Sequence, residues 1–282
     1  MDWKASYAPR AAVNYKIWLE RLIEVCGEKE LQEFTIMDVV NYRKFLEGKF
    51  NSYSVQYAII IVKNFFQFYK NQDYICLNPS LIKLPRIVAK SHRAVSEQEF
   101  ESVLSEIPKS GFASIRDQLI ICMLWDTGVR VSELTDLDVS QINENRHNTI
   151  ITTKKTGLKR TIMWSKMTHE LLLKYMALRI NECSQTTSHA LFLGWKQGTG
   201  WYSRLTTRTV ERIIKKYVGN AKILERITPH SFRHGWAHKR RDQNAPLAFI
   251  QRGLGHVSPV STFVYEQYKD VEFEKCAKKY LT

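Results

Sequence analysis

Four short clusters in the second half of the sequence combine residue types that bind phosphate or attack it. In chain order they hold Arg130 with Glu133, a lysine-rich turn with Lys154, Lys155 and Lys159, His230 with Arg233, and His256 followed nine residues later by Tyr265. Arginine forks match phosphate oxygens in pairs, histidine and lysine move protons, and a tyrosine hydroxyl can act as a nucleophile. Such a set suits phosphoryl transfer, which depends on positioned cations around the equatorial oxygens.

Helix ends are expected to position the first and third clusters. Gly128 ends one helical pattern and Arg130 opens the next, where backbone amides and a guanidinium can share an anion. Glu133 follows three residues later and can hold the Arg130 guanidinium. At the same spacing, His230 and Arg233 lie on one face of a later helix.

The lysine-rich turn is expected to be the tip of a β-hairpin. Residues 149–153 and 160–164 are β-branched or apolar segments, and Gly157 lies in the turn between them. Elsewhere the pattern after residue 95 is mostly helical, with further helices expected at 114–126, 168–181, 206–218, 230–241, 247–252 and 259–267. The fold class is therefore mainly α with one small antiparallel hairpin.

A break in the helical pattern divides the chain between Asn78 and Ala94. Prolines interrupt the pattern there, and Ser96 with Glu99 then predicts a capping box at the start of a new helix. Three amphipathic segments precede the break, at 15–26, 36–46 and 54–69; Thr35 is expected to cap the second, and Ser52 or Ser54 the third. We expect an all-helical domain over 1–86, a linker over 87–94 and a mixed, mostly helical domain over 95–282.

Composition narrows the class of protein. The 282 residues are 44% hydrophobic and 25% charged, which is typical of a folded globular chain. The five cysteines are scattered without a C-x-x-C pair, and we find neither a signal peptide nor an apolar run that could span a membrane, so a cytoplasmic protein is expected. The net charge of +14 is spread over both halves and favours a nucleic-acid partner.

Taken together, the four clusters resemble those of the tyrosine recombinase (phage integrase, Xer-like) family. The segment 127–134 is similar to its first arginine box, 155–160 to its hairpin lysine motif, His230-x-x-Arg233 to its second box, and the spacing from His256 to Tyr265 to its nucleophile segment. The resemblance covers nearly the whole chain. In the first domain, which is similar to the family's core-binding, DNA-clamping domain, it rests on pattern only.

The resemblance implies a role for each residue. Tyr265 would attack a scissile phosphodiester and form a 3′-phosphotyrosyl link, Arg130, Arg233 and His256 would hold the non-bridging oxygens, His230 would accept a proton or bind the phosphate, and Lys155 would protonate the leaving 5′-oxygen. No metal or other cofactor is expected, because the covalent link conserves the bond energy. The His230, His234 and His238 stripe could suggest zinc, but Arg233 and the basic 239–241 segment disfavour a dication.

Several assignments stay open. Lys155 is favoured over its neighbour Lys154 and over Lys159, and Tyr268 lies one helical turn after Tyr265 on the same face. DNA phosphates are candidate partners for Lys44, Lys63, Lys154, Lys159, Lys239, Arg240 and Arg241, with a solvated surface as the alternative.

At the level of function, the resemblance implies a site-specific recombinase of the integrase or resolvase type. Four protomers would act on two double-stranded DNA sites through a Holliday junction, with residues 271–280 docking into a neighbouring protomer and with accessory proteins a further requirement in some systems. The chain begins directly with the helical domain, so a simple Xer-type or mobile-element enzyme in the nucleoid is expected. A type IB topoisomerase-like nicking and resealing enzyme and a non-catalytic DNA-binding protein are the alternatives.

Overall fold

The computed structural model describes residues 9–87, 93–153, 157–184, 186–196, 200–256 and 262. Its backbone contacts divide the chain into two compact units, residues 1–90 and 91–282. Within the described ranges, none of the helices combines the length and the apolar character that a membrane span requires.

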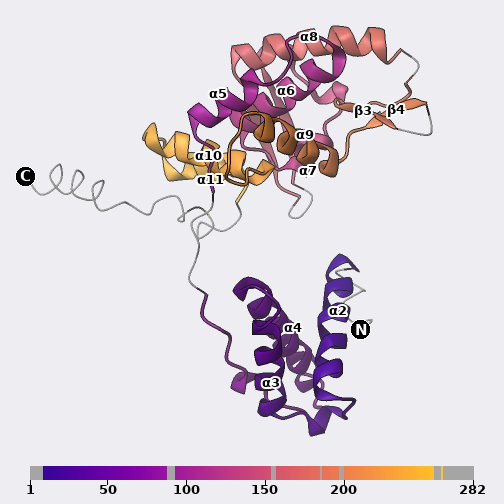
Figure 1. Ribbon diagram of the computed structural model, residues 1–282, viewed down its shortest axis with the longest axis vertical. Coiled ribbons are helices and arrows are strands. Elements are labelled where there is room, and N and C mark those ends of the chain that lie inside the picture. Colours follow the sequence, from indigo (N-terminus) through magenta and orange to yellow (C-terminus); the bar gives the residue numbers. More distant parts are fainter. Residues whose placement is uncertain are drawn as a thin grey trace, which may run out of the picture. The chain divides into compact units, whose positions relative to one another are not determined.

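The first unit is a helical bundle built from α2 (Pro9–Cys26), α3 (Ile36–Glu47) and α4 (Ser52–Lys70), with 3-10 turns at Leu31–Glu33 and Pro79–Leu81 (Figure 1). Thr35 caps α3 in a reciprocal box with Asp38, as expected from the sequence. At the start of α4 the sequence prediction was wrong, because Asn51 and not Ser52 or Ser54 is the cap: the Asn51 side chain accepts from the Ser54 amide at 3.0 Å. The three helices contact one another in pairs and enclose one apolar core.

Helices also dominate the second unit, which contains two separate antiparallel hairpins. Its elements are α5 (Glu97–Ser105), α6 (Phe112–Thr127), α7 (Val131–Thr135), β1 (Asn148–Thr152), β2 (Lys159–Met163), α8 (Lys166–Glu182), β3 (Leu193–Lys196), β4 (Trp201–Arg204), α9 (Thr207–Asn220), α10 (Pro229–Asp242) and α11 (Leu247–Leu254), with 3-10 turns at Val139–Gln141 and Glu144–Arg146. The predicted fold class, mainly α with small antiparallel strands, is confirmed. The helix expected at 259–267 lies outside the described residues except for Thr262, which is helical.

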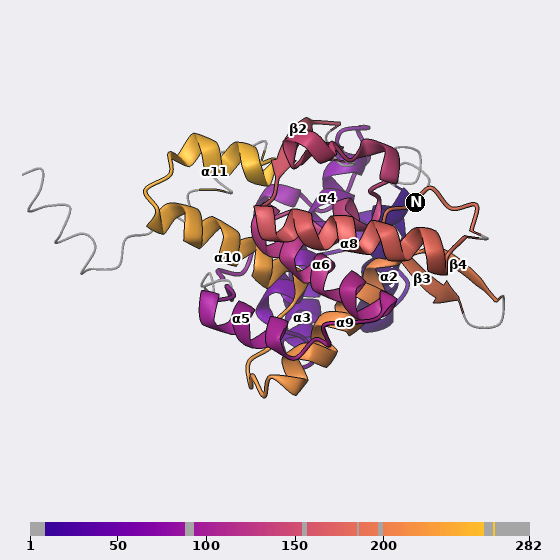
Figure 2. The same ribbon diagram turned by 90° about the horizontal axis from the view of Figure 1, so that it is seen from above.

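Helix α6 forms the centre of this unit. Every residue from Leu119 to Leu124 is fully buried, because α5, α7, α8, α9 and α10 all contact α6. Figure 2 shows α6 in the middle of the unit, among α5, α8, α9 and α10. A helix that is apolar on all sides must be enclosed in this way to be stable. The C-terminal end of α6 leads directly to Arg130, so a deeply buried helix positions the first arginine.

The hairpin that the sequence predicts is present as β1 and β2, and its side chains alternate between the two faces. Ile151 pairs with Arg160 and Thr149 with Ile162, and these four side chains are buried while their neighbours face outward. Arg160 therefore occupies a core-facing position with only 4% of its surface exposed.

The hairpin of β3 and β4 is absent from the sequence prediction. Its strands have four residues each, and Gly194 interrupts the first, where a Cβ atom would lie 2.7 Å from the Leu205 side chain. Strands this short, with a glycine in the sequence, give no clear alternation. This hairpin lies on the opposite side of the unit from α10 and α11 (Figures 1 and 2).

Candidate active site

The junction between α6 and α7 presents Arg130. Gly128 ends α6 in the left-handed conformation (φ 60°), and a Cβ there would lie 3.0 Å from two ring carbons of Trp236, so both the backbone angle and the space favour glycine. Arg130 then occupies the N-cap position of α7. Its side chain remains 35% exposed, so the guanidinium reaches from the interior to the surface.

The buried Glu133 side chain binds Arg130. Its carboxylate accepts the Arg130 backbone amide at 2.8 Å and Arg130 Nη1 at 3.0 Å, so the contact expected between these residues is present. The same carboxylate also receives both Nη atoms of Arg160, at 3.0 and 2.7 Å, and the Thr153 hydroxyl at 3.1 Å. Burial alone would raise the pKa of Glu133, but these donors, Arg160 foremost, outweigh burial and lower the pKa to about 2. Glu133 is therefore a buried carboxylate that stays ionised at neutral pH.

Arg233 joins three helix ends. Thr228 caps α10 in a reciprocal box with Ser231, and Arg233 follows in the first turns of that helix with 2% of its surface exposed. Its Nη1 donates to the Gly128 carbonyl at 2.8 Å and its Nη2 donates to the Leu254 carbonyl. The ends of α6 and α11 are thus fixed against α10 by one guanidinium.

His230 and His256 lie at the edges of this cluster. His230 is exposed on the first turn of α10, and its ring meets that of His234 edge-on, with the centroids 4.7 Å apart. His256 follows the left-handed Gly255 at the end of α11, and its Nδ1 lies 2.9 Å from the hydroxyl of the buried Thr262. Burial, followed by the positive charges of Arg233, Arg130 and Arg160, lowers the pKa of His256 to about 4. The imidazole is therefore neutral at pH 7.

Residues far apart in the sequence thus converge: Arg130, Glu133, His230, Arg233 and His256 surround the ends of α6, α10 and α11. Lys154, Lys155, Tyr265, Tyr268 and residues 271–280 lie outside the described residues. The hairpin strands approach the same cluster through Thr153, whereas the side chain of Lys159 is exposed on β2.

The other candidate DNA contacts have varied surroundings. Lys239 forms an ion pair with Glu97, Arg240 bonds Gln243 and Arg241 pairs with Asp242. In the first unit Lys44 is exposed, and Lys63 donates to the Ile82 carbonyl at 3.4 Å. Across the part of the chain that is described, no three His, Cys, Asp or Glu side chains come together as a group that could hold a metal ion.

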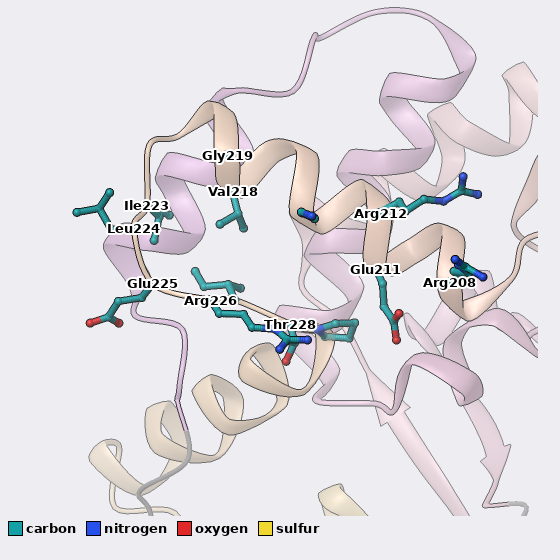
Figure 3. Close-up of a pocket in the computed structure, with 13 residues that line it drawn as sticks. Arg208, Glu211, Arg212, Val218, Gly219, Ile223, Leu224, Glu225, Arg226 and Thr228 are labelled. Carbon is teal, nitrogen blue, oxygen red and sulfur yellow. The ribbon is translucent and has the colours of Figure 1, made fainter. Parts of the chain in front are cut away.

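A pocket beside this cluster adds cations that the sequence analysis did not single out. It is bordered by α9 and by the segment that leads into α10, and ends at Pro229, next to His230. Figure 3 shows Arg208 and Arg212 projecting from α9, with Arg226 on the facing segment. Arg208, Arg212 and Lys215 are exposed, whereas Val210, Ile213 and Ile214 on the same helix are buried, so the spacing of cations along α9 was the available signal.

Comparison with known proteins assigns the chain to a family. Residues 93–272 match the family model of the phage integrase family. The chain is 27% identical over 262 residues to a probable integrase/recombinase protein of Methanocaldococcus jannaschii, covering 90% of this chain and 78% of that protein. It is 29% identical over 233 residues to tyrosine recombinase XerA of Pyrococcus furiosus, covering 82% of this chain and 76% of the relative.

The fold agrees with solved structures as well. The crystal structure of the XerH site-specific recombinase bound to its difH substrate aligns with a TM-score of 0.75 at 19% identity, over 95% of this chain and 79% of that one. The chain therefore belongs to the phage integrase family, the tyrosine recombinases, which break and rejoin DNA strands.

Proposed function

We propose that this enzyme cleaves and rejoins both DNA strands at a specific site through a 3′-phosphotyrosyl intermediate on Tyr265. The observation that carries the proposal is the positive cluster of Arg130 and Arg233 beside the neutral His256. A phosphodiester that enters this cluster brings negative charge close to the two guanidinium groups, and that charge favours the protonated form of His256.

The proposed chemical step transfers the phosphoryl group from the DNA 5′-oxygen to Tyr265. The Tyr265 oxygen attacks phosphorus, the bond from phosphorus to the 5′-oxygen breaks, and the phenol proton passes to His230 or to a phosphate oxygen. A phenol with an ordinary pKa near ~10 needs such assistance at neutral pH. Lys155 supplies the proton that the leaving 5′-oxygen takes up. Arg130, Arg233 and His256 hold the non-bridging oxygens, where charge accumulates in the transition state.

Double-stranded DNA recombination sites are the proposed substrate, and the proposed assembly is a homotetramer on two sites. The XerH relative was crystallised bound to its difH substrate, and a lambda integrase dimer was crystallised on a COC′ core site. The exposed cations Arg208, Arg212 and Lys215 extend the positive surface beyond the reacting phosphate. The enzyme would act on DNA in the cytoplasm, with accessory proteins where synapsis requires them.

Covalent capture tests the nucleophile. The protein is incubated with fragments of the DNA that surrounds its own gene, denatured with detergent and examined for a protein–DNA adduct. The adduct should disappear with Tyr265→Phe and persist with Tyr268→Phe. Loss with Tyr268→Phe alone would move the nucleophile by one helical turn, and DNA binding without any adduct would contradict catalysis.

The general acid is tested by changing the leaving group. A duplex with sulfur in place of the bridging 5′-oxygen releases a thiolate, which needs no proton donor because its pKa is far lower than that of an alkoxide. Lys155→Ala should be slow on the normal duplex and restored on the sulfur duplex, whereas Lys154→Ala and Lys159→Ala should cleave both at similar rates. If Lys154→Ala or Lys159→Ala shows the restoration instead, the general acid is reassigned to that lysine.

The assembly is tested by removing residues 270–282. The truncated protein should bind a single site but form no synaptic complex and no recombinant product. Recombination at the full rate would contradict the exchange of residues 271–280 between protomers. Relaxation of supercoiled DNA without recombinant products would indicate a nicking and resealing enzyme instead.

A further inference from the structure

Among the described cations beside the active site, Arg160 is the most buried after Arg233, and the chemistry proposed above gives it no direct role. Its side chain is 2% exposed on the core-facing side of β2, opposite Ile151. A buried guanidinium is costly unless its donors are satisfied, so its contacts identify what it holds.

Those contacts reach three separate elements. Nη1 and Nη2 form a fork on the Glu133 carboxylate at 3.0 and 2.7 Å, Nη1 also donates to the Thr153 hydroxyl at 2.8 Å, and Nε donates to the Gly253 carbonyl at 2.9 Å. Glu133 belongs to α7 and binds Arg130. Thr153 directly follows β1. Gly253 lies in the last turn of α11, three residues before His256.

A second observation concerns Gly255. A Cβ atom on this residue would lie 2.8 Å from Arg160 Nη1 and 3.1 Å from its Cζ, and the residue has a φ of +62°. The end of α11 therefore passes directly against the guanidinium. Both the backbone angle and the close approach require glycine at position 255.

We infer that Arg160 is a positioning residue for DNA cleavage, which aligns Arg130 through Glu133, His256 through the end of α11, and Thr153 beside them. The inference rests on the function proposed above and adds a requirement to it. Without the Arg160 fork, Arg130 would be the one guanidinium bound to the Glu133 carboxylate. The carboxylate would then attract the Arg130 guanidinium more strongly and draw it inward, away from the phosphate. Lysine cannot replace the fork, since an ammonium is a point charge without the planar geometry that spans a carboxylate and a carbonyl.

The chain offers a matched control in Arg116. Its Nε and Nη2 bind the Asp117 carboxylate at 3.0 and 2.7 Å, and its Nη1 donates to the Leu193 carbonyl at 2.9 Å. Like Arg160, it is a mostly buried guanidinium shared between a carboxylate and a backbone carbonyl. Its contacts lie at α6 and β3, with no catalytic candidate among them.

The test compares Arg160→Lys with Arg116→Lys on a duplex that carries the site sequenced from the wild-type adduct. Both variants are expected to lose thermal stability. Single-turnover cleavage by Arg160→Lys should fall about 100-fold, the effect of roughly an ångström of misplacement, while its DNA affinity stays within about 3-fold of the wild type. Arg116→Lys should cleave at a rate within about 2-fold of wild type. Equal cleavage rates for the two variants would overturn the inference.

A neutral phosphate separates positioning from general loss of structure. On a duplex with a methylphosphonate at the scissile position, one charged oxygen is absent and the demand for Arg130 falls. The defect of Arg160→Lys should shrink at least about 10-fold on this duplex, whereas an equal defect on both duplexes would contradict action through Arg130. If Arg160→Lys does not fold, Gly255→Ala is the substitute, because it presses on the guanidinium without removing it.

The two levels of the proposal fail differently. A wild-type protein that binds the duplex and forms no adduct overturns the proposed function, and with it the role of Arg160. A wild-type protein that forms the Tyr265-dependent adduct, together with an Arg160→Lys variant of equal rate, overturns only the positioning role.

Discussion

Two buried carboxylates of the second unit, Glu133 and Asp117, are each held by an arginine, yet their pKa values move in opposite directions. Glu133 is 6% exposed and Asp117 5%, so burial acts on both to a similar degree. Burial dominates at Asp117 and raises its pKa. At Glu133 the hydrogen bonds and charges outweigh burial and lower the pKa to about 2.

The number and charge of the donors explain the contrast. Asp117 receives Arg116 on one oxygen and the Tyr217 hydroxyl at 3.2 Å on the other. Glu133 receives two guanidinium groups, a backbone amide and a hydroxyl. A carboxylate between two arginines remains ionised, and it keeps both arginines in place. Asp117 is hydrogen-bonded to one cation, Arg116, and lies in the core where α6 meets α9.

The largest difference is expected on neutralising each carboxylate. Glu133→Gln removes the charge that compensates the buried Arg160, which should cost about 3–5 kcal/mol of unfolding free energy. Asp117→Asn should cost about 1–2 kcal/mol, because that carboxylate already has a weaker preference for its charged form. Urea unfolding of the full chain, followed by tryptophan fluorescence, measures both. Equal losses would remove the distinction between the two sites.

The pH dependence should also have opposite signs. The folded pKa of Glu133 is about 2, below its ordinary 4.5, so its contribution to stability is present above pH 4.5 and is lost as the pH falls toward 2. The stability advantage of wild type over Glu133→Gln should therefore shrink by up to about 3 kcal/mol across that window. The pKa of Asp117 is raised above 3.8, so its ionisation destabilises the fold at higher pH, and wild type should gain relative to Asp117→Asn as the pH falls toward 3.8. Two difference curves of the same sign would contradict the electrostatic account.

Two glycines near these sites extend the comparison. Gly255 (φ +62°) lies against Arg160, whereas Gly111 (φ +89°), at the start of the helix that carries Asp117, has open space around its Cβ position. Alanine at either position should cost about 1–3 kcal/mol from backbone strain. Only Gly255→Ala should also slow cleavage of bound DNA, since it alone displaces the guanidinium. A cleavage defect in Gly111→Ala would mean that backbone strain elsewhere in the unit also slows cleavage, so the effect of Gly255→Ala could not be assigned to Arg160.

Local patterns in the sequence predicted the elements around these sites well. The capping box of Ser96 with Glu99 and the contact of Arg130 with Glu133 span three residues on one chain segment, so spacing alone specifies them. The β1–β2 hairpin was predicted from two β-branched or apolar segments on either side of a turn that contains Gly157. These features are short-range. Local backbone geometry determines them, so they can be predicted without knowledge of the tertiary packing.

Contacts between distant segments could not be predicted in the same way. Arg233 and the Gly128 carbonyl are 105 residues apart in the sequence, and Arg160 and the Gly253 carbonyl are 93 apart. The alternation of β2 did place Arg160 on the same face as Ile162, so a charged residue at an inward-facing position was a visible signal. Its partners were not visible, because they depend on how α7 and α11 pack against the hairpin.

The smallest effects concern the two hydroxyl donors. Thr153 donates to Glu133 at 3.1 Å and accepts from Arg160, while Tyr217 donates to Asp117 at 3.2 Å. Thr153→Val and Tyr217→Phe should each cost about 1 kcal/mol. Tyr217→Phe should raise the pKa of Asp117 further, because the charged form loses one of its few donors, and carboxyl carbon chemical shifts in a pH titration report this directly. Thr153→Val should leave Glu133 ionised throughout the same titration above pH 4.5, since two arginines and a backbone amide remain. A Glu133 that titrates near its ordinary pKa in Thr153→Val would mean that the hydroxyl, and not the paired guanidinium groups, keeps this carboxylate charged.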